Sequence, residues 1–297
     1  PLISLAYPET VNDLVDFGLM LRSKNSSIPL LALHVVADDI ENGQAAEGKK
    51  MLEKAVKHAS ATDNTLLPIT RFDFNISNAI VYTIREHQVT DIVIGLHHKA
   101  NIRDFLGPTT DSILKKTQET VFIYKSKQPF NTFKRMVIVV PPNAELEPGF
   151  THWFNKLTTV AKAADLPLLF YANNQTIDYL QQMNERKETP MDLKFQEFSS
   201  WNDFLIFSRE IKSNDLFIIV SSRKGHVSYN PQLEKISAHL AKYFDKHSFI
   251  ILFPKQLEYG YGIEDVPFVN TTFIDSISDN MNVFKKLSRM IKNRMNK

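Results

Sequence analysis

The chain has 297 residues, of which 43% are hydrophobic and 23% are charged, so it is long enough for two domains with ordinary buried cores. Its formal net charge of +2 gives no electrostatic argument for nucleic acid, which usually binds a concentrated basic face, and we expect no such partner. The absence of cysteine excludes disulfides, thiolate metal sites and a cysteine nucleophile. No apolar run approaches the ~18 residues that span a bilayer, which predicts a soluble chain.

The first part of the sequence alternates strand and helix signals. Short apolar runs predict strands over Leu2–Tyr7, Pro29–Val36, Leu66–Phe74, a stretch beginning at Asp91, and Val121–Tyr124. Helical spacing of apolar residues predicts helices over Glu9–Lys24, Gln44–Ser60, Asn75–His87 and Asp111–Thr117. This strict alternation is typical of an α/β fold, in which helices cover both faces of a parallel sheet.

The same order begins again after the polar segment Lys125–Lys134. The predicted strands are Met136–Val140, Leu166–Tyr171, Met191–Phe198, Leu216–Val220 and Ser248–Phe253. The predicted helices are Phe150–Ala161, Thr176–Asn184, Trp201–Ile211 and Pro231–Tyr243. The remaining tail carries a basic, amphipathic stretch around Phe284, Leu287 and Ile291, which we expect to be helical.

The second series repeats the first at an interval of about 130 residues, the size of one small α/β domain. We therefore predict a first domain over residues 1–128, a second over 133–255, and an extension over 256–297. The two fifth strands, Val121–Tyr124 and Phe249–Leu252, are short and apolar, and we expect both at sheet edges. Unpaired edges favour pairing, so we expect these strands to join the domains as a pseudo-twofold dimer within the chain.

The loop between Gly95 and Thr110 is the first candidate site. A glycine at the carboxyl end of a parallel strand allows a ligand to approach the backbone, and the helix start behind it offers free N–H groups to phosphate. Gly95, Gly107, Thr109 and Thr110 are the residues that this interpretation involves. The alternative is a loop whose glycines only satisfy turn geometry.

These features resemble the universal stress protein family: Leu33-His34-Val35-Val36 in strand two, and the strand–Gly–loop–Gly–Thr sequence of strand four. The resemblance covers about residues 1–255 and implies two tandem, five-stranded, Rossmann-like domains. In this family such domains bind ATP or AMP, so Val35 joins the glycines and threonines as a residue that would contact nucleotide. More narrowly, the chain resembles the cytoplasmic C-terminal region of bacterial monovalent cation:proton antiporters of the second type.

The sequence departs from the family's nucleotide-binding pattern, which is Gly-x-x-Gly and, after a spacer, Gly-Ser or Gly-Thr. His98 stands at the second glycine, Gly107 arrives a residue early, and Pro108 separates it from Thr109. Tyr7 and Pro8 stand where binding members carry an aspartate. In the second domain the corresponding loop has no Gly-Ser or Gly-Thr, but Arg223 and Lys224 there are candidates for holding an anion. ATP and AMP are therefore the only cofactors that we consider.

Three other patterns favour ordinary structural roles. Gly43-x-x-x-x-Gly48-Lys49-Lys50 almost matches a P-loop, but lysine replaces the Ser or Thr that holds Mg²⁺. Adjacent His97 and His98 point to opposite sides of an extended segment, so we predict no metal site there, although they are candidates for sensing pH. Asp38 and Asp39 most simply form a solvated turn.

No catalytic motif stands out, and we predict a protein that is not an enzyme. The resemblance implies a regulatory or sensor module on the cytoplasmic side of an inner-membrane cation/proton antiporter, whose transporter domain belongs to the same polypeptide. A sequence that begins at Pro1 instead of Met fits a piece of such a longer protein. The alternative is a free-standing tandem universal stress protein that binds ATP or AMP. Homodimerisation stays open in either case.

Overall fold

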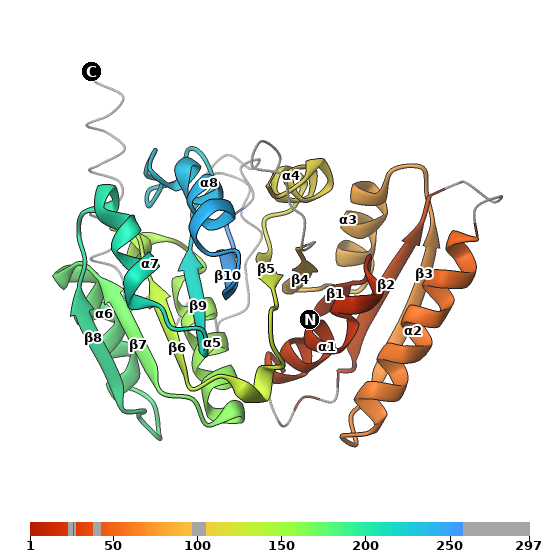
Figure 1. Ribbon diagram of the computed structural model, residues 1–297, viewed down its shortest axis with the longest axis horizontal. Coiled ribbons are helices and arrows are strands. Elements are labelled where there is room, and N and C mark those ends of the chain that lie inside the picture. The colour runs from red at the N-terminus through yellow and green to blue at the C-terminus, as the bar shows by residue number, and fades with distance from the viewer. Residues whose placement is uncertain (23–25, 27, 38–42, 97–104, 258–297) are drawn as a thin grey trace, which may run out of the picture. The chain divides into compact units, whose positions relative to one another are not determined.

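The computed structural model describes residues 1–22, 26, 28–37, 43–96 and 105–257. The described part contains one ten-stranded sheet with the strand order β3-β2-β1-β4-β5-β10-β9-β6-β7-β8 (Figure 1). Pro1–Gln256 form one compact unit. Because residues 258–297 lie outside the described part, the expected basic helix stays a prediction, as do the proposals for Asp38, Asp39, His97 and His98.

The first repeat follows the predicted order. Its elements are β1 (Leu2–Ser4), η1 (Pro8–Thr10), α1 (Val11–Met20), β2 (Leu30–Val36), α2 (Gln44–Ser60), β3 (Leu66–Phe72), α3 (Ile76–Glu86), β4 (Asp91–Gly95), α4 (Pro108–Lys116) and β5 (Thr120–Lys125). Asn75 caps α3, because its side chain accepts a hydrogen bond from the N–H of Asn78. The first strand ends at Ser4 and not at the expected Tyr7, and Pro8 begins a 3₁₀ turn that precedes α1.

The second repeat follows η4 (Phe130–Thr132). Its elements are β6 (Arg135–Val139), η5 (Ala144–Leu146), α5 (Phe150–Ala164), β7 (Leu168–Ala172), α6 (Asn174–Glu185), β8 (Leu193–Glu197), η6 (Trp201–Ile206), α7 (Phe207–Glu210), β9 (Asp215–Val220), α8 (Leu233–Tyr243) and β10 (Ser248–Phe253). Each repeat thus contributes five parallel strands, which confirms the predicted α/β fold of two tandem parallel sheets.

The predicted helix over Trp201–Ile211 is mostly wrong in type. Residues Trp201–Ile206 form a 3₁₀-helix, and only Phe207–Glu210 are α-helical. The buried aromatic residues Trp201, Phe204 and Phe207 recur every third position, which matches the three residues per turn of a 3₁₀-helix. Packing of these rings against each other therefore favours a 3₁₀-helix here over the predicted α-helix.

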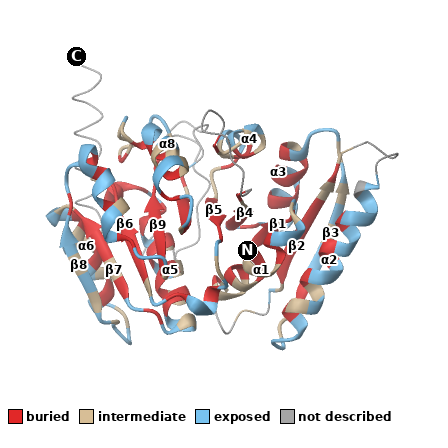
Figure 2. Ribbon diagram, in the orientation of Figure 1, coloured by how far each residue is buried: buried red, intermediate tan, exposed pale blue. Residues whose placement is uncertain are grey.

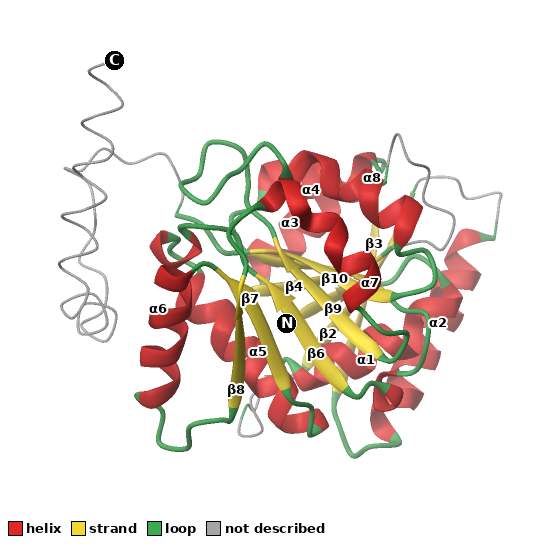
Figure 3. Ribbon diagram, turned by 60° about the vertical axis from the view of Figure 1, so that its left-hand side comes forward, coloured by secondary structure: helices red, strands yellow, loops and turns green. Residues whose placement is uncertain are grey.

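Two hydrophobic cores lie on the two faces of the sheet. One is formed with α1, α2, α5 and α6, and the other with α3, α4, α8 and the η6–α7 segment (Figure 3). Along β5 the side chains alternate: Phe122 belongs to the first core, and Val121 and Ile123 belong to the second. Figure 2 shows the strands as mostly buried and the exposed residues on the outer sides of the helices. Both cores contain residues of both repeats.

The repeats meet through β5 and β10, the antiparallel pair of the sheet. The register places Ile123 opposite Ile251, with two further pairs on either side. Every residue of both strands is buried. This confirms the predicted pairing of the two fifth strands, which in the joined sheet lie at its centre and not at an edge.

Continuity of both cores predicts that the repeats unfold together. Phe122→Ala in the first repeat and Phe217→Ala in the second each remove a fully buried ring, and each should cost about 3–5 kcal/mol of unfolding free energy. Urea unfolding followed by circular dichroism should show one transition that both variants shift.

The matched control is Phe72→Ala, because that ring is 71% exposed and its removal should cost less than about 0.5 kcal/mol. Two separate transitions, of which each variant moves only one, would contradict a shared folding unit.

Candidate functional site

Gly95 ends β4 at the carboxyl edge of the first repeat. A β-carbon at this position would lie 3.1 Å from Cδ1 of Leu14 and 3.2 Å from Oγ1 of Thr10. Thr10 is buried, and its hydroxyl donates to the carbonyl oxygen of Tyr7. Close packing of α1 and η1 against the strand end therefore accounts for the glycine without a ligand.

Gly107, Thr109 and Thr110 come together at the start of α4. Gly107 has φ +79°, a conformation that favours glycine, and its carbonyl oxygen accepts the N–H of Asp111. Thr109 is half-buried and Thr110 is buried, while Pro108 at the first helical position carries no N–H donor. Val35 lies near the end of β2, which β1 separates from β4, and it packs against the core that α3 and α4 cover.

Arg223 follows β9 in the second repeat, and its guanidinium contacts backbone carbonyl groups, while its predicted anion binding stays a prediction. It donates to the carbonyl oxygens of Leu114 (3.3 Å), Glu119 (2.8 Å) and Pro254. The first two acceptors belong to the first repeat. Burial lowers the pKa of Arg223 to about 10, partly offset by the charges of Glu147 and Glu119. Lys224 is exposed and pairs with Glu234 at 2.8 Å.

The segment after β10 covers the start of α5. A β-carbon on Gly149 would lie 2.6 Å from both the backbone N and the backbone O of Lys255, so only glycine permits this approach. The side chain of Lys255 pairs with Glu119 at 3.0 Å, and the N–H of Gln256 donates to the carbonyl oxygen of Gln118. The chain leaving the second repeat is therefore fastened to the first.

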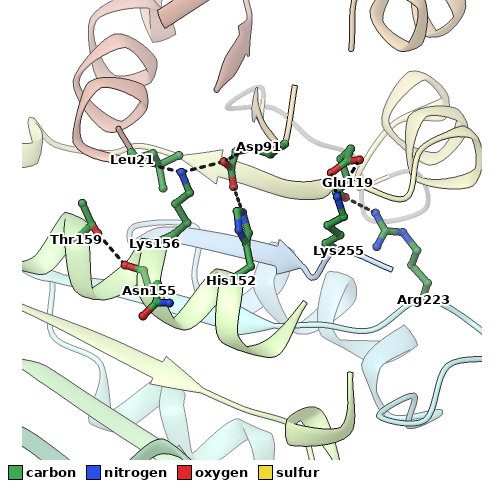
Figure 4. A network of polar contacts seen from close by, with 10 residues as sticks. Leu21, Asp91, Glu119, His152, Asn155, Lys156, Thr159, Arg223 and Lys255 are labelled. Atoms are coloured by element: carbon green, nitrogen blue, oxygen red, sulfur yellow. Dashed lines mark hydrogen bonds and ion pairs between the residues drawn. The ribbon is translucent and has the colours of Figure 1, made fainter. Parts of the chain in front are cut away.

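A network of charged side chains crosses the junction between the repeats, and Figure 4 shows it from close by. Asp91, at the start of β4, is fully buried. Its two carboxylate oxygens lie 2.6 Å from Nε2 of His152 and 3.0 Å from Nζ of Lys156, both on α5 of the second repeat. Lys156 also donates to the carbonyl oxygen of Leu21, at the end of α1. One carboxylate thus joins helix α5 to the first repeat.

The electrostatic balance at Asp91 favours its charged form. Burial raises the pKa of the carboxyl group, but the hydrogen bond with His152 and the charges of His152 and Lys156 outweigh it and lower the pKa to about 2. Thr90 donates a further hydrogen bond of 2.8 Å to the same carboxylate. This buried charge is therefore paired and hydrogen-bonded, as stable burial requires.

Sequence reasoning did not identify Asp91, His152 or Lys156. His152 and Lys156 are four residues apart, so they share one helix face. Asp91 is an acidic residue at the start of a strand whose other residues are apolar. That anomaly was the one available signal, because its partners are distant in the sequence and depend on how the two repeats dock.

Two further observations concern metal binding and membrane crossing by the described residues. Their histidine, aspartate and glutamate side chains form no group of three that would hold a metal ion. Among them we find no helix with the length and apolar character that crossing a bilayer requires.

A hollow of about 400 Å³ lies between β3 and the end of α3, lined by residues including Arg71, Glu86 and His87.

Asp91→Asn should weaken the junction. The variant leaves Lys156 without a carboxylate partner, and we expect a loss of about 3 kcal/mol in unfolding free energy at pH 7, measured by urea unfolding. In the wild type the Asp91 pKa is depressed, so its contribution of roughly 2 kcal/mol is present above pH 4 and is lost as the pH falls toward 2. The variant should therefore lose less stability than the wild type across that window.

Asp192→Asn is the control, since Asp192 is exposed and should change stability by less than about 0.5 kcal/mol. Identical pH dependence in the wild type and Asp91→Asn would show that the network does not stabilise the fold.

Comparison with known proteins supports the fold. No protein-family model matches the sequence, and no curated protein matches it either. Among solved structures, a universal stress protein from Archaeoglobus fulgidus is 12% identical with a TM-score of 0.56, and the match covers 87% of this chain and 97% of that one. A candidate universal stress protein from Pseudomonas aeruginosa is 11% identical with a TM-score of 0.55, covering 86% of this chain and 92% of that one.

A third structure, of a functionally unknown protein from Pseudomonas aeruginosa, is 10% identical with a TM-score of 0.54 and covers 86% of this chain and 92% of its own. At such identities the similarity is one of fold alone. Each match covers more of this chain than one repeat provides. The chain therefore has the universal stress protein fold, in two tandem copies that share one sheet.

Proposed function

We propose that this chain is a non-enzymatic regulatory module of a cation/proton antiporter, acting on the cytoplasmic side of the membrane. The link to an antiporter rests on the sequence resemblance described above, and the transporter domain of the same polypeptide is the proposed partner. The module acts through a conformational change. A change of pH, ligand or partner contact alters how the two repeats dock. The docked state then favours one state of the transporter.

The observation that carries this proposal is the charged junction between the repeats. Asp91 is buried against His152 and Lys156 of the other repeat, so a change in charge there acts directly on docking. The guanidinium of Arg223 donates to the carbonyl oxygen of Glu119, and the side chain of Lys255 pairs with the Glu119 carboxylate, so both side chains tie the second repeat to the α4–β5 connection.

The alternative is a free-standing stress protein that binds ATP or AMP. The observation in its favour is the start of α4, where Gly107 keeps the positive φ of a phosphate-binding turn and two threonines follow the proline. Against it, Pro108 removes one N–H donor, and Thr10 and Leu14 fill the space beside Gly95. These features favour a structural loop over a nucleotide site.

Calorimetry with Mg²⁺-ATP separates the two functions. We expect no binding at about 100 µM ATP, the range in which a typical nucleotide site would saturate. Gly107→Val and Gly43→Val form a matched pair, because both glycines have positive φ and open space around them. Tight binding that Gly107→Val abolishes and Gly43→Val preserves would establish the nucleotide-binding alternative.

The regulatory role is tested on the full-length polypeptide in vesicles. Asp91→Asn should shift the pH midpoint of cation/proton exchange by about half a unit or more, because it loosens the docking of the repeats. Asp192→Asn should leave the midpoint unchanged. An unchanged midpoint for Asp91→Asn, in a protein whose junction is shown by unfolding to be weakened, would rule out regulation through this junction.

A further inference from the structure

Lys187 lies just after α6 in an environment unlike that of the other described lysines. Its Nζ donates a 2.6 Å hydrogen bond to Oγ1 of Thr158 and stands 4.4 Å from the centre of the Phe154 ring. Neither Lys187 nor the neighbouring Lys162 forms an ion pair with a carboxylate among the described residues. Lys162 instead donates to the hydroxyl and carbonyl oxygens of Thr189.

This environment favours the neutral amine. Burial and the positive charge of Lys162 lower the pKa of Lys187 to about 8. The face of the Phe154 ring attracts an ammonium ion, but the same ring also excludes water from one side of it. Desolvation beside a second cation is a general way in which proteins make a lysine nucleophilic at neutral pH.

The hydrogen bond also leaves the reactive electron pair of the amine unused. The hydroxyl of Thr158 donates its own hydrogen to the carbonyl oxygen of Asn155, so its oxygen accepts from Lys187. The nitrogen is held by one of its hydrogens, and its lone pair is free for a reaction. The side chain of Lys187 is partly exposed, which gives a small reagent access.

We propose that Lys187 is a covalent modification site that takes an acyl group from small acyl phosphates. The lone pair of Nζ attacks the acyl carbonyl carbon, a C–N bond forms, and the C–O bond to phosphate breaks. Phosphate leaves with the bonding electron pair, and the proton lost by nitrogen passes to phosphate or water. Lys162 attracts the anionic reagent and stabilises the leaving phosphate by its charge.

The acylated side chain of Lys187 is compatible with the surroundings of the unmodified one. An acylated Lys187 keeps one N–H to donate to Thr158, and it carries no charge to repel Lys162. Modification therefore removes an unfavourable like-charge contact while it preserves the hydrogen bond, and we expect the fold to tolerate it.

The test is a time course of the full chain with acetyl phosphate at pH 7.5, with acetylated peptides quantified by mass spectrometry. Lys187 should react at least about tenfold faster than Lys49, which is 78% exposed and pairs with Glu53. Because the pKa of Lys187 is about 8, its rate should be half-maximal near pH 8 and should approach a plateau above about pH 9. Equal rates at the two lysines in the wild type would overturn the proposal by themselves.

A charge reversal then tests the role of the neighbour. Lys162→Glu should slow acetylation of Lys187 about fivefold, because an anion there stabilises the ammonium form and repels the reagent. Lys50→Glu changes the net charge equally at an exposed position and should leave the rate unchanged. Equal slowing by both variants would assign the effect to net charge and would overturn the assigned role of Lys162.

Discussion

The antiparallel pairing of β5 with β10 is the interaction on which the rest of the structure depends. It places β5 and β10 at the centre of one sheet, where all of their residues are buried. It also merges the hydrophobic layers of the two repeats into continuous cores on both faces. Two edge strands that would otherwise favour association with other chains are paired with each other within this one.

That pairing also decides where the two ends of each strand lie. Just beyond β5, the N–H of Lys127 donates to the hydroxyl of Ser248 at the start of β10, and just beyond β10, Gln256 donates to Gln118 ahead of β5. The end of each fifth strand is thus fixed to the start of the other. Direct hydrogen bonds therefore connect the two repeats at both ends of the paired strands.

The sequence predicts the elements and the joined fifth strands well, because these follow from hydrophobic patterns that are local to each strand or helix. It could not predict the partners of Asp91 or Arg223. Asp91 meets His152 only through the register of β5 on β10, and the acceptors of Arg223 are backbone carbonyl groups, which no side-chain pattern reveals. A cation in a loop after a strand resembles an anion site until the neighbouring backbone is seen.

The two repeats differ at their carboxyl edges for a structural reason. In the second repeat, the segment after β10 lies against Gly149 at the start of α5, and Arg223 reaches across to Pro254 and to the first repeat. The outgoing chain is therefore packed against this edge of the second repeat. In the first repeat the start of α4 keeps its glycine conformation, while α1 and η1 pack against Gly95. The two repeats thus use these edges differently: the second repeat contacts the first there, and the first keeps a glycine turn at the start of α4.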